Sequence, residues 1–350
     1  MAGDFVSRLP KIYGMYTGGF LFFVIALAIA EQMGLPNVWI GYVFMAATIG
    51  LYAMIGIMSR TAETDEYYVA GRRVPALFNG MATGADWMSA ASFIGMAGTL
   101  YAQGYDGLAF VMGWTGGYVL VALFLAPYLR KFGQYTIPDF LGARYGGNLP
   151  RTIGIICAIT ASFTYVIAQI YGAGIITSRF LGIDLATGVW VGLIGVLVCS
   201  LLGGMRAVTW TQVAQYIVLI IAYLVPVVWL SIKVTGNPVP QLAYGEVLQQ
   251  IGQLEQQLGV TAGHATPFVK NDMVNFLALT FCLMVGTAAL PHILMRFFTT
   301  PSVKEARKSV GWSLFFIFLL YFTAPAYAAF AKLEVYSNVI GQSIATLPAW

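Results

Sequence analysis

The chain consists of long runs of apolar residues separated by short polar connections. Windows of about 20 apolar residues indicate membrane-spanning helices. Nine such windows occur, so we expect nine spans, at 12–32, 38–58, 76–103, 107–129, 152–178, 185–203, 208–232, 273–298 and 310–331. Only the connection from Val234 to Asn271 is long.

That connection carries apolar residues at helical spacing among Gln and Glu, namely Leu242, Val247, Leu248, Ile251, Leu254 and Leu258. The spacing predicts an amphipathic helix. Such a helix lies in the outer interface of the membrane or caps the helix bundle by packing on it.

The third span has a carboxylate near its midpoint, in the run Thr83-Gly84-Ala85-Asp86. An ionised side chain at the centre of a span costs roughly 2.5 to 3.5 kcal/mol on insertion scales, so it faces a bundle interior, a cavity or an ion. Gly84 weakens the helix, and hydroxyl residues nearby, Ser89 and Ser92 among them, satisfy carbonyls freed by a break. A broken span of this kind is typical of a transporter site, and the carbonyls of Ala85 and Met88 are suited to a hard cation.

The eighth span has a second interruption, Gly286-Thr287-Ala288-Ala289-Leu290-Pro291. Proline suits the first position of a new half-helix, whose free N–H groups attract an anion. Two broken spans, one rich in carbonyls and one electropositive, favour joint binding of Na⁺ and a small carboxylate, although ordinary kinks give the same pattern.

Further polar residues lie within or near the spans. Tyr165 and Gln169 are four residues apart on the fifth span, where they either line a cavity or join helices by hydrogen bonds. His292 and Arg296 share a face after the second break, and His292 either gates an inner path or bonds to a neighbouring helix. Because no Lys or Arg falls mid-span near either break, we expect the anion to be met without a buried ion pair.

Composition places the chain among polytopic membrane proteins. Hydrophobic residues make up 59% of the 350 residues, charged residues 9%, and the mean hydropathy is +0.77, which no soluble domain of this length shows. The basic residues are dispersed, which argues against a nucleic-acid partner. With two histidines and no cysteine cluster, the chain lacks the constellations of a membrane enzyme or redox subunit.

The basic residues also predict the orientation. If the N-terminus is cytoplasmic, every Lys and Arg falls on the cytoplasmic side except Arg179, Lys233, Lys270 and Lys332. The positive-inside rule therefore predicts a cytoplasmic N-terminus. We expect a multi-pass protein of a bacterial inner membrane.

Several motifs resemble the sodium/solute symporter family, and its acetate permease branch in particular. They are DEYYVAGR, NGMATGADWMSAASFIG, GYDG, GGMRAVTWTQVAQ and GTAALPHILMRFFTTPSVKEARKSV, and the similarity extends from about residue 38 to residue 331. The resemblance implies an all-α, leucine-transporter-type fold of inverted five-helix repeats.

The same resemblance implies a division of the chain. Residues 1–60 form two peripheral spans and residues 61–233 the first repeat. Residues 234–271 form an extracytoplasmic loop, and residues 272–350 begin an incomplete second repeat. In the family, hydroxyl groups that complete the Na⁺ site lie on the next helix. We therefore expect the polypeptide to be truncated and, as it stands, unable to transport.

The resemblance implies Na⁺-coupled uptake of a small monocarboxylate such as acetate, and no cofactor. The family's Na⁺ ligands correspond to the carbonyls of Ala85 and Met88, with Asp86 and Ser89 beside them. We expect the substrate to contact Ser89, Ser92, Gln169, Gly286 and Thr287, and the inner path to pass His292 and Arg296. Gln212 replaces an aspartate of many members, which leaves H⁺ as an alternative coupling ion. The rival function is the symporter-like input domain of a membrane signalling protein.

Overall fold

The computed structural model describes residues 2–341, which form helices joined by turns and loops, with no β-strand among them. All nine predicted apolar segments lie in helices. By length and apolarity, the described residues contain six helices able to cross a membrane, or seven if one broken pair counts as a span. Many large apolar side chains face outward, such as Phe22 at 73% exposure, as expected for helices that face lipid.

The chain divides into two compact units, each made of segments distant in sequence. The first comprises Met1–Ala90, Phe124–Leu219 and Leu290–Ser313, and the second comprises Ala91–Leu123, Ile220–Ala289 and Leu314–Trp350.

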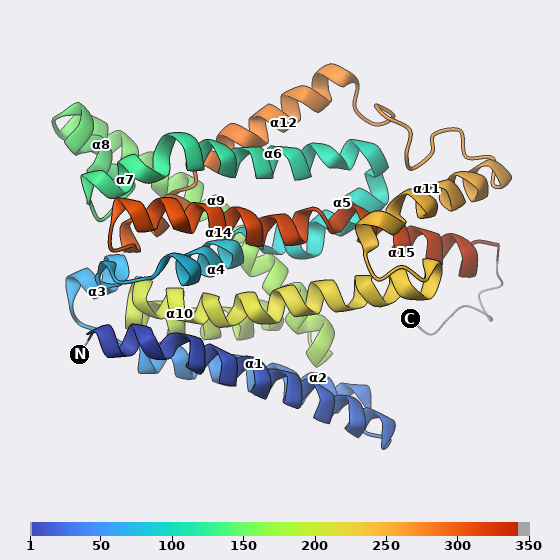
Figure 1. Ribbon diagram of the computed structural model, residues 1–350, viewed down its shortest axis with the longest axis horizontal. Helices are drawn as coiled ribbons and strands as arrows, with labels where there is room; N and C mark the ends of the chain where they lie inside the picture. The colour runs from blue at the N-terminus through green and yellow to red at the C-terminus, as the bar shows by residue number, and fades with distance from the viewer. Residues whose placement is uncertain (1, 342–350) are drawn as a thin grey trace. The chain divides into compact units, whose positions relative to one another are not determined.

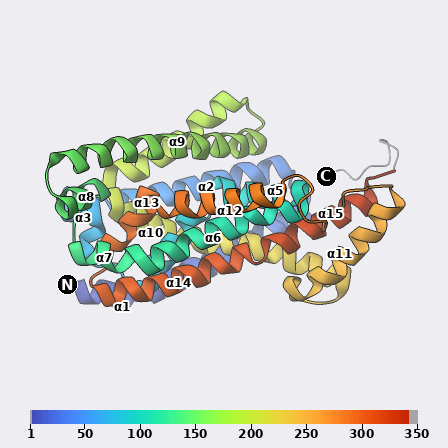
Figure 2. The same ribbon diagram turned by 90° about the horizontal axis from the view of Figure 1, so that it is seen from above.

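The first unit begins with two long helices that contact each other, α1 and α2 (Figure 1). Its elements are α1 (Ala2–Gln32), α2 (Asn37–Met58), α3 (Thr64–Val69), the 3₁₀ turn η1 (Ala70–Arg72), α4 (Ala76–Trp87), α7 (Ala126–Phe132), α8 (Ile137–Tyr145), α9 (Asn148–Leu181), the first part of α10 (Leu185–Thr235), α13 (Pro291–Met295), η5 (Arg296–Thr299) and the start of α14 (Val303–Tyr321). Figure 2 shows α8 packed beside α9.

Gly204 divides α10 into the two segments that the sequence predicts. Its φ of 50° and ψ of −139° are not helical, and glycine adopts such angles without the cost a Cβ imposes. A Cβ at this position would overlap the carbonyl and ring of Tyr67 in α3. An ion pair between Arg206 and Glu66 lies beside this contact. The motifs DEYYVAGR and GGMRAVTWTQVAQ therefore dock on each other, and glycine permits the close approach.

The second unit contains the π-helical turn η2 (Ala91–Gly95), α5 (Met96–Gln103), the 3₁₀ turn η3 (Gly104–Gly107), α6 (Leu108–Leu120), α11 (Pro240–Gln257), α12 (Met273–Ala288), α15 (Ala324–Asn338) and the ends of α10 and α14. A π-helical turn η4 (Val121–Leu125) spans the boundary between the units. Glycines of α6 pack closely on α12: a Cβ at Gly113 would come within 2.6 Å of Leu283 and one at Gly117 within 2.8 Å of the Met284 carbonyl. Small residues permit this approach, as is common between membrane helices.

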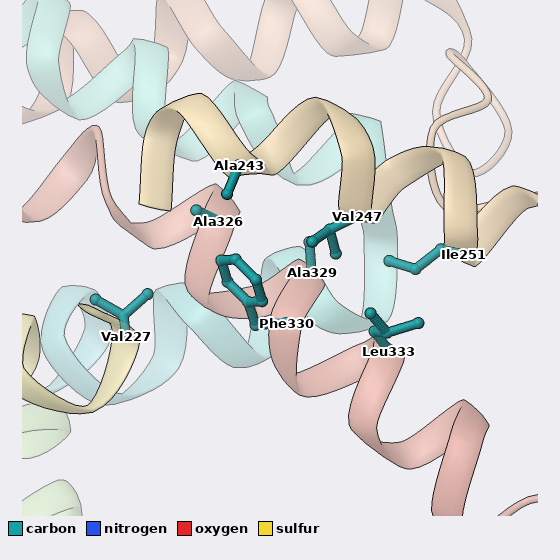
Figure 3. Close-up of a cluster of buried hydrophobic side chains, with 8 residues drawn as sticks. All are labelled: Val227, Ala243, Val247, Ile251, Ala326, Ala329, Phe330 and Leu333. Carbon is teal, nitrogen blue, oxygen red and sulfur yellow. The ribbon is translucent and has the colours of Figure 1, made fainter. Parts of the chain in front are cut away.

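The long connection contains α11, whose apolar face packs on α15 (Figure 3). Val247 and Ile251 are 0% and 1% exposed, against Phe330 and Leu333 of α15. Leu242 and Leu258, two other apolar residues of this series, are 74% and 45% exposed. The contacts are those of a cap packed on other helices.

The rest of the connection is held by two buried carboxylates of the second unit. Asp106, 0% exposed, accepts hydrogen bonds from the backbone N–H groups of Phe268, Lys270 and Asn271 at 2.8, 2.6 and 3.0 Å. Glu255 accepts from the backbone N–H of His264 at 2.9 and 3.0 Å. Burial, together with the charge of Lys332, lowers the pKa of His264 to about 4.

Candidate functional site

Helix α4 has one apolar and one polar face, and both are buried in the first unit. Phe78 and Ala82 pack with Leu9 of α1 and Val213 of α10. On the polar face, Asn79 accepts from the Thr299 hydroxyl at 3.0 Å and donates to the Ser309 hydroxyl at 3.1 Å. The polar face thus joins α4 to η5 and α14.

Asp86 follows on this polar face, seven residues after Asn79, and forms a buried ion pair. Its Oδ2 lies 2.5 Å from Nε of Arg296, and the two side chains are 9% and 1% exposed. Gln212 donates to its other oxygen, Oδ1. Arg296 also donates from Nη1 to the hydroxyl of Thr209 at 2.9 Å. Both oxygens of the carboxylate are therefore engaged, as the low polarity of such a site requires.

The chain breaks directly after Asp86. Helix α4 ends at Trp87, and Met88 has a ψ of 57°, outside the helical range. The last carbonyls of a helix have no partner within it, and those of Ala85 and Met88 lie in or next to this final turn. The predicted break is confirmed. It begins at Met88, two residues after Asp86.

Helix α9 holds the other side of the break. The backbone N–H of Ala90 donates to Oε1 of Gln169 at 3.0 Å, and Tyr165 forms a side-chain hydrogen bond with Ser89. Tyr165 also packs on His292, with ring centroids 4.4 Å apart. The sequence left two interpretations open for Tyr165 and Gln169, namely lining a cavity and joining helices. Their contacts are those of polar residues that join helices.

The second predicted break is also present. Helix α12 ends at Ala288 and α13 begins at Pro291, as expected from proline at a first helical position. The new helix has only five residues before it continues as η5. Its macrodipole is therefore smaller than that of the half-helix that the sequence predicts.

Arg296, expected along the inner path, lies in a buried ion pair with Asp86. The sequence left this pair unpredicted, because the expectation of no buried ion pair concerned the substrate anion alone. The helical period from His292 ends at Met295, and the tighter η5 begins at Arg296. As a result, His292 contacts α9, whereas Arg296 contacts Asp86.

The predicted site residues belong to both units. Ala85, Asp86, Met88, Ser89, Gln169, His292 and Arg296 belong to the first unit, whereas Ser92, Gly286 and Thr287 belong to the second. Thr287 donates to the Leu283 carbonyl of its own helix at 2.5 Å.

Sequence reasoning missed Asn79, Thr209 and Thr299, which are all 0% exposed and hydrogen-bonded to this network. Threonines are common in membrane helices as packing residues, so their type alone gives no signal. The spacing of Asn79 does give a signal, because Asn79 lies seven residues before Asp86 and hence near the same helix face.

Two cavities lie in the first unit, and one of them reaches the hydrogen-bond network of Asp86. One of about 530 Å³ lies among α8, α9 and α13 and is lined by Ser162, Pro291 and Met295. The other, of about 340 Å³, lies between α2, α9 and α10 and reaches Gln212. The Oε1 atom of Gln212 has no hydrogen-bond partner among the described residues.

Comparison with known proteins adds three relatives. The chain is 44% identical to an uncharacterized symporter of Cupriavidus necator over an alignment of 446 residues, covering 99% of this chain and 65% of the relative. It is 31% identical to a monocarboxylic acid transporter of Corynebacterium glutamicum over 309 residues, covering 84% of this chain and 55% of that protein.

Among solved structures, a Na⁺-coupled sialic acid symporter in a substrate-bound outward-open state matches 87% of this chain and 63% of its own chain. The TM-score is 0.67 and the identity 18%. The chain thus spans less than two thirds of the length of these relatives, and it shares the leucine-transporter-type, inverted-repeat fold of the solved symporter. The sodium:solute symporter family model matches residues 67–346, and the chain belongs to that family.

Proposed function

We propose that the protein is a secondary transporter that couples Na⁺ to the uptake of a small monocarboxylate such as acetate. Family and fold are those of symporters, and one relative is a monocarboxylic acid transporter. The observation that carries the proposal is the chain break that follows a buried, ion-paired carboxylate at the end of α4.

In this proposal the cation binds at the end of α4. The carbonyls of Ala85 and Met88 are its ligands, with the hydroxyl of Ser89 beside them. Carbonyl oxygens at a broken helix are hard ligands, which suit Na⁺. Asp86 contributes negative charge, part of which Arg296 neutralises. The alternative coupling ion is H⁺.

The substrate and the inner path use neighbouring groups. Ser89 and Gln169, which contact the break in the first unit, are candidates to contact the substrate. The roles of Ser92, Gly286 and Thr287 remain predictions from the sequence. His292 lies beside the 530 Å³ cavity, since its neighbour Pro291 lines that cavity, and together with Arg296 it is our candidate for the inner path.

We place the protein in a bacterial inner membrane with a cytoplasmic N-terminus. The support is the distribution of Lys and Arg, which favours one side of the spans.

The test is uptake of labelled acetate by cells that express the natural protein, with and without an inward Na⁺ gradient. We expect uptake only with the gradient. Propionate, glycolate and pyruvate should compete with acetate, whereas glucose and proline should not. Uptake that follows a proton gradient at constant Na⁺ would reject Na⁺ coupling, and competition by a sugar would reject the monocarboxylate assignment.

A further inference from the structure

Two arginines of the first unit lie next to each other, apart from the candidate site. Arg130 is in the last turn of α7 and Arg72 is in η1. Their Nη1 atoms are 3.9 and 3.7 Å from the point that a Cβ of Gly133 would occupy. Backbone carbonyls hold both side chains in place: Arg72 donates to Gly133 at 2.6 Å, and Arg130 donates to Thr300 and Pro301 at 2.6 and 2.9 Å.

This pair has no carboxylate partner within salt-bridge distance in the part of the chain that the structure describes. The Nη1 atom of Arg72 is buried and makes no hydrogen bond there. The nearby Asp65 accepts from the hydroxyl of Tyr135 at 2.5 Å, and Arg72 lies over the Tyr135 ring at 5.5 Å. Two like charges and an unsatisfied donor are unfavourable together, and an anion between them would relieve both costs.

The position of the pair indicates what kind of anion fits. The apolar span that contains α7 ends at Phe132, two residues after Arg130, so the pair lies at the depth of lipid headgroups. Tyr128 and Phe132 on the same helix are 59% and 39% exposed, and aromatic side chains of this kind favour the membrane interface. Lys131 and Lys304 add exposed positive charge nearby.

We propose that Arg72 and Arg130 bind the phosphate group of an anionic phospholipid. Arginine pairs suit phosphate because the guanidinium presents several donors in a fixed plane. The bound lipid would bridge η1, α7 and the connection at Thr300-Pro301, all within the first unit. Inorganic phosphate has the same chemistry but lacks acyl chains to lie along the exposed aromatic residues.

Native mass spectrometry of the purified natural protein tests the proposal. Phosphatidylglycerol is titrated against phosphatidylcholine with identical acyl chains, using wild type, Arg72→Gln and Arg130→Gln. The control is Arg73→Gln, which removes the same charge from the next residue, whose side chain is 62% exposed. A hydrogen bond to a charged phosphate contributes about a tenfold gain in affinity or more. We therefore expect each test variant to bind phosphatidylglycerol about tenfold more weakly, with a clearly smaller loss in the control and the phosphatidylcholine affinity unchanged.

Equal weakening in the control and in Arg72→Gln would overturn the site, because it would reduce the effect to net charge. Displacement of phosphatidylglycerol by millimolar inorganic phosphate would assign the pair to a soluble anion and reject the lipid. If Arg130→Gln does not fold, Arg72→Gln decides the question, since that variant loses one hydrogen bond to a carbonyl and the contact with the Tyr135 ring, whereas Arg130 holds two carbonyls.

Discussion

At the scale of single residues, the Asp86–Arg296 pair is the main determinant of the candidate site. Removing one partner of a buried pair leaves an uncompensated charge and costs about 3–5 kcal/mol. We expect Arg296→Gln and Asp86→Asn each to lower the melting temperature in detergent, and the double variant to lower it by less than the sum of the two. Asp65→Asn, which removes an exposed hydrogen bond, is the control. Additive effects would mean that the two side chains do not interact.

The same pair gives a functional prediction. Asp86→Asn in the natural protein should weaken the apparent affinity for Na⁺ more than it lowers the amount of folded protein, because the carboxylate lies beside the proposed ligands. Uptake is measured against Na⁺ concentration at matched expression. A variant with wild-type Na⁺ dependence would show that Asp86 is a packing residue.

His264 predicts a pH dependence outside the membrane spans. Its pKa is about 4 in the folded protein and about 6.5 when unfolded, so between these values the unfolded chain binds more protons. Stability should therefore fall as the pH drops from 6.5 towards 4, by up to about 3 kcal/mol from this residue. Melting curves at pH 7 and 5 measure the loss, and His264→Gln should reduce it. An unchanged pH dependence in that variant would assign the effect to other groups.

At the scale of elements, α11 shows what apolar spacing can and cannot predict. The helix itself follows from the spacing, but which of its apolar residues are buried depends on where α15 lies. We expect Ile251→Ala to cost about 2–5 kcal/mol, since it leaves a cavity against α15. Leu242→Ala, at 74% exposure, should change stability little. Both are compared by thermal unfolding, and similar losses in the two variants would argue against the packing in Figure 3.

The two broken spans were predictable for a comparable reason. Gly84, the nearby serines and Pro291 are local signals, and a break depends on local backbone chemistry. The partners across each break were not predictable. The pairing of Asp86 with Arg296 joins residues 210 positions apart, and it depends on the change from α13 to the 3₁₀ geometry of η5. Helical periodicity does not report such a change.

At the scale of the whole molecule, the nine apolar windows fall on helical segments of the described residues because hydropathy depends on composition alone. They did not show that the chain divides into two units made of distant segments, since that division depends on contacts far apart in sequence. The boundaries of the two repeats remain a prediction.

Topology can be tested directly. Gln249 and Ser302 are both exposed, and with nine spans and an inner N-terminus they lie on opposite sides of the membrane. Cysteines placed there in a background without native cysteines should react with an impermeant reagent from opposite sides, Gln249 from outside. Reaction of both from one side would overturn the number of spans.

The three backbone hydrogen bonds on Asp106 have a consequence for how the long connection responds to solvent. Phe268, Lys270 and Asn271 lie outside any helix, yet their amide hydrogens are bound to one buried carboxylate. In heavy water these amides should exchange for deuterium slowly, as helical amides do, while their neighbours exchange quickly. The connection would then combine irregular geometry with the kinetic protection of regular structure, and Asp106→Ala, which removes both acceptor oxygens, should abolish that protection at the three positions together.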